Sequence, residues 1–250
     1  MRTASRVLAV TTLLLGCAPA ASAQTADEVI EKYLSAVGGR AALSKLTSRS
    51  MAGTITVATP VGEFTGPIEI VNQAPNKSRT WITLDLSSAG AGQMVQDQRF
   101  DGTVGYVIDT LQGNREITGG QLENLKNGAF PNPFMNYREM GATVELGGKE
   151  RVGEHDAYLL IFKPRSGAIT RQYLDAGSYL PIKLVITVEV PQLGRELEQT
   201  TEFLDYREVD GVKLPFQVKG SSSVQTFTVN MTKVEHNTTI DQEIFSKPAQ

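Results

Sequence analysis

The sequence predicts a mainly β fold, a large antiparallel sheet shaped as a sandwich or barrel, with helices at the start and in the middle of the chain. Apolar and polar residues alternate with a period of two along most of the 250-residue chain, as in strands whose two faces differ in solvation. Hairpin sequences such as Asp101-Gly102 and Asp210-Gly211 separate the alternating runs at short intervals. Helical periodicity is confined to two stretches, 25–46 and 119–140.

The first 23 residues are predicted to be a secretory signal peptide. Arg2 and Arg6 precede an apolar run, 7–16, and Ala21-Ser22-Ala23 matches the small-x-small pattern of a cleavage site. The run is too short to span a bilayer, which takes roughly 20 helical residues. A second interpretation stays open, because Leu14-Leu15-Gly16-Cys17 resembles a lipobox in which Cys17 would be lipidated. The protein is therefore expected in the periplasm, either free or anchored through Cys17.

The charge and cysteine content exclude several classes of function. Removal of the signal peptide takes away two arginines and no acid, which moves the net charge from −3 to −5. Nucleic-acid binders carry clustered basic patches, so no nucleic-acid partner is expected. Cys17 is the only cysteine in the chain, so residues 24–250 must fold without a disulfide. No linker or shift in composition divides residues 24–250, which are predicted to form a single domain.

The first expected helix begins at a capping box. Thr25 and Glu28 have the required spacing, and an apolar stripe with helical spacing follows from Ala26 to Val37. Gly38-Gly39 ends this helix, since glycine adopts the left-handed C-terminal conformation at little cost. A shorter helix is expected at 41–46.

About eleven strands are expected after residue 48, within twelve alternating segments. The middle segment, 119–140, interrupts them with short helices around Leu122 and after Pro131 and Pro133. It is predicted to pair with the N-terminal helix as a cover for one face of the sheet, although its aromatic residues could equally complete an ordinary core. The expected strands lie at about 51–57, 64–70, 79–86, 93–100, 104–108, 143–146, 157–163, 170–175, 181–190, 196–206, 212–219 and 224–235.

The sequence contains no recognisable catalytic or metal-binding motif. His155 and His236 have no partners at metal-ligand spacing, and both are expected to be surface residues of turns. No Gly-x-Ser-x-Gly, Walker or His-Glu-x-x-His motif occurs. The sequence therefore predicts neither an enzyme nor a site for a metal or cofactor.

Three segments resemble a known family. They are Ala26-Asp27-Glu28-Val29-Ile30-Glu31-Lys32-Tyr33-Leu34 followed by Gly38-Gly39, then Glu150-Arg151-Val152-Gly153, and Leu204-Asp205-Tyr206-Arg207-Glu208-Val209-Asp210-Gly211-Val212-Lys213-Leu214-Pro215. Together they resemble the periplasmic outer-membrane lipoprotein-sorting proteins of the LolA/LolB-like superfamily. The resemblance implies a half-open antiparallel β-barrel of about eleven strands under a helical lid, with an apolar cavity for acyl chains of lipids or lipoproteins.

Alternation along the strands predicts which side chains line such a cavity. The candidates are Ile82, Leu84, Tyr106, Phe134, Leu160, Phe162, Leu184, Ile186 and Phe227. A family arginine that latches the lid has three candidate equivalents, Arg79, Arg99 and Arg171.

The expected function is lipoprotein sorting or lipid shuttling, with an envelope protein as a possible partner and peripheral contact with a membrane. Three alternatives remain open: an envelope sensor that detects lipoproteins, a non-catalytic domain associated with an exported peptidase, and an enzymatic domain.

Overall fold

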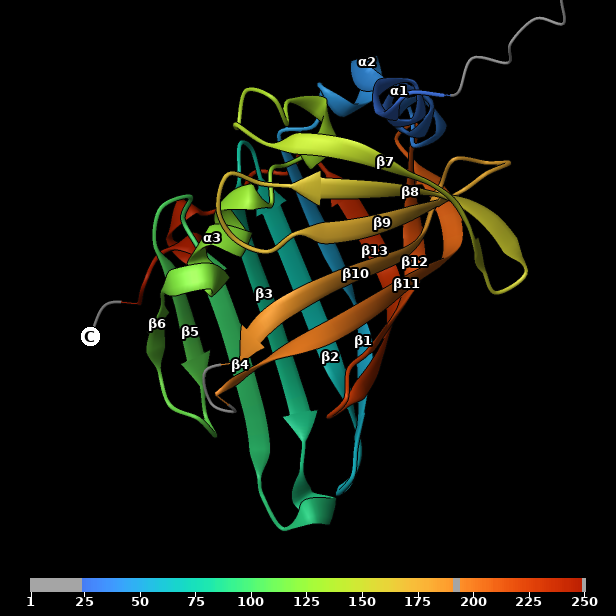
Figure 1. The fold of residues 1–250 in the computed structure, drawn as a ribbon. Helices are drawn as coiled ribbons and strands as arrows, with labels where there is room; N and C mark the ends of the chain where they lie inside the picture. The colour runs from blue at the N-terminus through green and yellow to red at the C-terminus, as the bar shows by residue number, and fades with distance from the viewer. Residues whose placement is uncertain (1–23, 191–193, 249–250) are drawn as a thin grey trace, which may run out of the picture.

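The structure, a computed structural model, describes residues 24–190 and 194–248; the predicted signal peptide and Cys17 lie outside them. Within these ranges the chain forms one antiparallel sheet of thirteen strands (Figure 1). The strands are β1 (Ser48–Thr59), β2 (Gly62–Gln73), β3 (Lys77–Asp85), β4 (Gln93–Phe100), β5 (Gly105–Asp109), β6 (Arg115–Ile117), β7 (Thr143–Val152), β8 (His155–Lys163), β9 (Thr170–Asp175), β10 (Pro181–Val190), β11 (Arg195–Val209), β12 (Val212–Ser221) and β13 (Thr226–His236).

The order of the strands makes a half-open barrel, as the family resemblance implies. The order is β6-β5-β4-β3-β2-β1-β13-β12-β11-β10-β9-β8-β7, so β6 and β7 are the two edges and do not pair with each other. The segment between them, 118–142, carries the chain from one edge to the other. The pairing of β1 with β13, from Arg49↔His236 to Ala58↔Thr226, joins the two halves of the sheet.

Three short helices and three helical turns complete the described chain. They are α1 (Ala26–Ala36), α2 (Arg40–Leu43), α3 (Gly119–Asn127), η1 (Ser87–Ala89), η2 (Pro133–Met135) and η4 (Gln242–Phe245). No helix in the described part of the chain is long and apolar enough to cross a bilayer.

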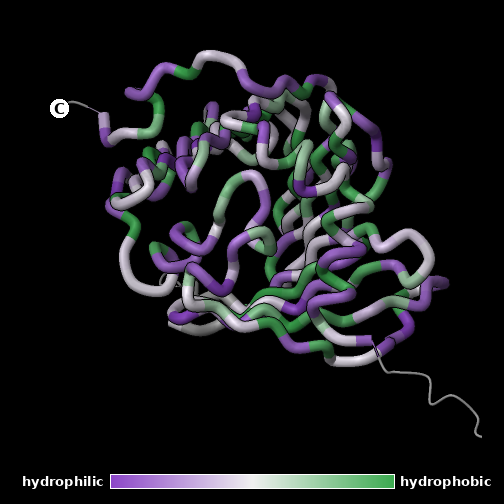
Figure 2. Tube along the Cα trace, turned by 90° about the horizontal axis from the view of Figure 1, so that it is seen from above, coloured by the Kyte–Doolittle hydropathy of each residue, from purple (hydrophilic) through white to green (hydrophobic). Residues whose placement is uncertain are grey.

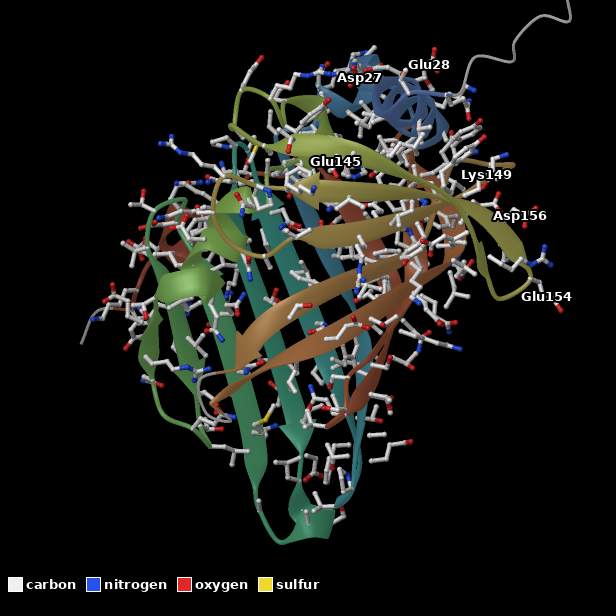
Figure 3. All side chains as sticks on the ribbon, viewed as in Figure 1. Asp27, Glu28, Glu145, Lys149, Glu154 and Asp156 are labelled. Carbon is white, nitrogen blue, oxygen red and sulfur yellow. The ribbon has the colours of Figure 1, made fainter. Side chains whose placement is uncertain are left out.

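The capping box predicted at α1 is confirmed. The Glu28 amide donates to Thr25 Oγ1 at 3.2 Å, and the Thr25 amide donates to Glu28 Oε2 at 3.0 Å. Behind this cap, α1 buries Val29, Ile30 and Leu34 against the upper end of the concave face. Its outer face is polar, and Figure 3 shows Asp27 and Glu28 directed away from the sheet.

An aromatic core fills the space under α1. The ring centroid of Phe134, on η2, lies 5.6 Å from that of Tyr33 and 5.6 Å from that of Phe162, both in edge-to-face geometry. Phe130 and Tyr137, from the same crossover segment, are buried in this cluster. These aromatic residues therefore serve as ordinary packing, and α1 and η2 close the upper end of the half-barrel.

The sheet has thirteen strands, and the twelve alternating segments of the sequence correspond to all of them except β6. β6 has only three residues, Arg115–Ile117, which is too short to show a period of two in the sequence. Strand β3 begins at Lys77 rather than Arg79, since its pairing with β2 extends to Gln73↔Lys77. In both places, pairing with a neighbouring strand adds residues that local pattern does not indicate.

Strands β2 and β3 approach closely at Gly66. A Cβ at this position would lie 1.8 Å from the carbonyl oxygen of Thr83. Glycine is therefore the residue that this contact between strands requires.

We predict that Gly66→Ala destabilises the protein by about 1–3 kcal/mol, because the added methyl group forces the two backbones apart. Urea denaturation followed by circular dichroism measures the change. Gly92→Ala is the matched control, since a Cβ at Gly92 would have no heavy atom within 4 Å. Equal stability of the two variants would show that the sheet absorbs the displacement.

Candidate functional site

The lower part of the concave face encloses an apolar cavity of about 680 Å³. Its walls come from β1 to β5, β12 and β13, with no contribution from α1 or α3. It is lined by Ile55, Val57, Thr59, Val61, Phe64, Ile68, Ile70, Thr80, Ile82, Leu84, Leu86, Met94, Gln96, Asp109, Leu111, Gln112, Val218, Gln225, Phe227, Val229 and Met231.

Strand register explains why these side chains share a face. Residues that pair directly across neighbouring strands point to the same side of the sheet. Val57 pairs with Phe64 on β2 and with Phe227 on β13, and Phe227 pairs with Gly220 on β12. A Cβ at Gly220 would lie 2.1 Å from the Phe227 ring, so the ring occupies the space above this glycine. The alternation of hydrophobic and hydrophilic residues along the strands is visible from above in Figure 2.

Three of the nine predicted cavity residues, Ile82, Leu84 and Phe227, line this cavity. Leu184 shares its face, since it pairs with Thr201, which pairs with Gly220. Ile186, two residues further along β10, shares that face as well, but both lie outside the cavity lining.

Another three predicted residues are placed in the aromatic core instead. Phe134, Leu160 and Phe162 are buried under α1 with exposed fractions of 3%, 0% and 5%. They share the concave side with the cavity, but the helical cover fills the space in front of them. Whether any of the nine residues contacts a ligand stays a prediction.

Tyr106 lies on the opposite, convex face, which corrects its predicted position. It pairs with Arg99, whereas Asp109 of the cavity pairs with Gln96. The two pairs are an odd number of residues apart along β5, so they point to opposite faces. Lys247 lies 5.1 Å from the centre of the Tyr106 ring, as the C-terminal segment crosses this face.

Exposed apolar side chains mark the mouth of the cavity. Val61, in the β1–β2 turn, is 78% exposed and Leu111, after β5, is 57% exposed. Asp109 is buried nearby, and its Oδ1 accepts the amides of Leu111 and Gln112 at 2.9 Å each. Its carboxylate is thus used to hold the turn, and the cavity surface stays mainly apolar.

The histidines do not form a catalytic cluster. His155 Nδ1 lies 3.0 Å from Asp175 and is largely exposed, as expected for a turn residue. The side chain of His236 is only 1% exposed, against expectation, because it packs at the end of β13 with Nδ1 3.1 Å from Asp210. No group of three or more metal-ligating side chains occurs within residues 24–190 and 194–248.

The three candidate latch arginines all pair with acids outside the helical cover. Arg79 and Arg99 donate to Asp97 at 2.8 and 2.7 Å on the convex face, and Arg171 pairs with Glu198 at 2.6 Å. Burial acts to raise the pKa of Asp97, but the hydrogen bonds from both arginines outweigh it and lower that pKa.

A residue that sequence reasoning missed, Arg49, contacts the helical cover. It lies on the concave face of β1, and its Cζ is 5.3 Å from the centre of the Phe130 ring. Arg49 borders a second cavity, of about 220 Å³, beside α1. The position of Arg49 in the same alternation as Met51 and Ile55 was a usable signal, since a charge in a run of inward-facing apolar residues is unusual.

The geometry matches known structures at the level of the fold. A LolA superfamily protein from Nitrosomonas europaea superposes with a TM-score of 0.57 at 15% identity, covering 90% of this chain and 99% of that chain. A DUF1329 family protein from Desulfovibrio piger gives 0.56 at 11% identity, with 88% and 96% covered. An outer membrane lipoprotein-sorting protein domain from Vibrio parahaemolyticus gives 0.55 at 12% identity, with 87% and 94% covered. No family model and no curated protein matches the sequence.

These comparisons define the class: the chain has the LolA-like fold. The half-open barrel that the resemblance implied is confirmed, with thirteen strands in place of about eleven.

We predict that Asp97→Asn lowers the free energy of unfolding at neutral pH by about 1.5–3 kcal/mol, because it removes charged hydrogen bonds and leaves two arginines without their carboxylate. A carboxyl group with a depressed pKa stabilises the fold above its unfolded-state pKa, and this contribution disappears as pH falls through the folded-state pKa. The difference between variant and wild type should therefore shrink below about pH 4.

Chemical denaturation at a series of pH values measures this difference. Glu198→Gln, which removes the acid of an exposed pair with Arg171, is the control and should have a much smaller effect. An Asp97→Asn effect that did not change with pH would contradict the assignment to the charged carboxylate.

Proposed function

We propose that this protein is a carrier of the cell envelope that holds acyl chains of lipids or lipoproteins in its apolar cavity. The observation that carries the proposal is the 680 Å³ space on the concave face, which the protein's own side chains leave unfilled. Ligand sites of proteins commonly have about 300–1,000 Å³. An apolar cavity of this kind costs stability when empty, so its retention favours a role in binding.

The chemistry of the lining favours an acyl chain over a polar ligand. Leucine, isoleucine, valine, phenylalanine and methionine make up most of the wall. Each CH₂ group removed from water contributes about 0.8 kcal/mol, so a chain gains affinity without polar contacts. Val61 and Leu111 at the mouth extend the apolar surface outward, where a chain would enter.

The structural relatives support the same class of ligand. One of them is described as an outer membrane lipoprotein-sorting protein domain, and its similarity covers 87% of this chain. Together with the predicted signal peptide, this supports a location in the periplasm. A binding role fits the mainly apolar wall, in which the carboxylate of Asp109 accepts the backbone amides of Leu111 and Gln112.

We predict that Ile70→Asp lowers the affinity for an acyl probe at least about tenfold, because it places a carboxylate in the cavity wall where the chain must lie. The measurement is titration of the purified mature protein with a fluorescent fatty acid, followed by native mass spectrometry of the complex. Val71→Asp is the matched control, since its side chain points to the convex face of the same strand, and it should bind like the wild type.

A lipid-transfer assay with the same purified protein distinguishes a carrier from a sensor. A carrier moves labelled phospholipid or lipopeptide between two vesicle populations, whereas a sensor binds the lipid without increasing its transfer. Absence of binding by the wild-type protein to fatty acid, phospholipid and lipopeptide would refute the proposal.

A further inference from the structure

Arg49 is a partly buried cation that has no counter-ion among the described residues. It pairs with Asn72 on β2 and with His236 on β13, at the upper end of the concave face. Its Nε is shielded from solvent and has no hydrogen-bond partner, and no ion pair within the described residues includes it. A buried charge that lacks a partner is costly to the fold. The arrangement is therefore one that an anionic ligand would complete.

The aromatic neighbour of Arg49 does not neutralise its charge. Phe130 lies at cation–π distance from Arg49, 5.3 Å from Cζ to the ring centre, and a phenyl ring stabilises a cation without supplying an anionic acceptor. The N–H groups lie in the plane and match the spacing of carboxylate and phosphate oxygens. Contact with Phe130 and binding of an anion are thus compatible.

The cavity beside Arg49 has the size and charge of an anion site. It measures about 220 Å³ and is bordered by a second cation, Lys213, and by the polar groups of Tyr33, Asn132 and Gln172. Among its described lining residues there is no aspartate or glutamate. Asn132 Nδ2 donates to the Tyr33 hydroxyl at 2.6 Å, so this part of the wall is held in place.

The neighbouring Tyr33 phenol leaves the positive charge of Arg49 uncompensated. Burial lowers the pKa of the Arg49 guanidinium to about 10, and the neighbouring Tyr33 opposes this shift. Burial also raises the pKa of the Tyr33 phenol. Arg49 is therefore charged and Tyr33 neutral at neutral pH.

We propose that this smaller cavity is an anion-binding site in which Arg49 and Lys213 hold a carboxylate or phosphate group. The site is distinct from the apolar cavity and does not depend on acyl-chain binding. Its volume is below the range of about 300–1,000 Å³ for larger organic ligands, which suits a free anion or the charged headgroup of a lipid.

The test is ¹⁵N NMR of the arginine Nε–H groups in the mature protein, titrated with inorganic phosphate, acetate and dihexanoyl phosphatidic acid. A saturable shift of the Arg49 Nε signal is expected with at least one of these anions, and none is expected with glycerol as a neutral probe. An Arg49 signal that responds to none of the anions, or equally to glycerol, overturns the proposal.

Variants show whether the binding belongs to this site. Arg49→Gln should weaken anion binding at least about tenfold, and Arg49→Lys should rescue it only in part, because lysine lacks the planar edge. Arg171→Gln, at an arginine already paired with Glu198, should bind like the wild type. If Arg49→Gln does not fold, Lys213→Gln replaces it, since Lys213 is exposed, and unchanged affinity in that variant overturns the proposal.

Comparison of the affinities for the different anions identifies the source of the bound group. Phosphatidic acid that binds at least about tenfold more tightly than inorganic phosphate identifies a lipid headgroup, whereas equal affinities identify a free anion. Ile70→Asp should leave the phosphate titration unchanged, so a failure of the acyl-chain proposal would be seen separately from a failure of this one.

Discussion

The antiparallel pairing of β1 with β13 is the contact on which the rest of the structure depends. The first six strands extend from β1 to one edge and the last seven from β13 to the other, so this single ladder joins the halves. Both edges stay unpaired with each other, and the sheet curves without closing. The concave face therefore has to be filled by something other than strands.

The chain fills only the upper part of that face. Helix α1 and the crossover segment place aromatic side chains such as Tyr33 and Phe134 over β8 and β9. The lower part receives no such cover, and its side chains line an open space instead. Core packing normally leaves few voids larger than a water molecule. The two ends of one sheet therefore differ: the upper end is filled by the aromatic core, and the lower end keeps the open space in which we propose that an acyl chain binds.

Much of the fold could be predicted from local sequence patterns, because helix caps and the alternation of strands depend on residues that are close together in the sequence. The capping box of Thr25 and Glu28 and the strands with clear alternation were found in this way. Strand β6 was not predicted, because its three residues are too few to show an alternation with a period of two. Alternation alone did not decide between a sandwich and a barrel. The half-open shape was predicted from the family resemblance.

The candidate site was predicted less completely, since it depends on which parts of one face are covered. Leu84 and Leu160 both face inward as alternation indicates, yet α1 covers only Leu160. Tyr106 was placed on the wrong face because the register of β5 against β4 is set by pairing across strands. The place of Arg49 in the strand alternation was a signal in the sequence, but the lack of a hydrogen-bond partner for its Nε is a property of the folded structure.

Helix α1 and the β1–β2 turn, which contains Val61, lie at opposite ends of the molecule (Figure 1). Strand β1 runs from beside α2 down to the turn that contains Val61, over twelve residues, or roughly 40 Å of extended chain. A lipid anchor on Cys17 would hold the protein by its closed end. The open end would then face into the aqueous compartment, where it could meet a partner arriving from the opposite membrane.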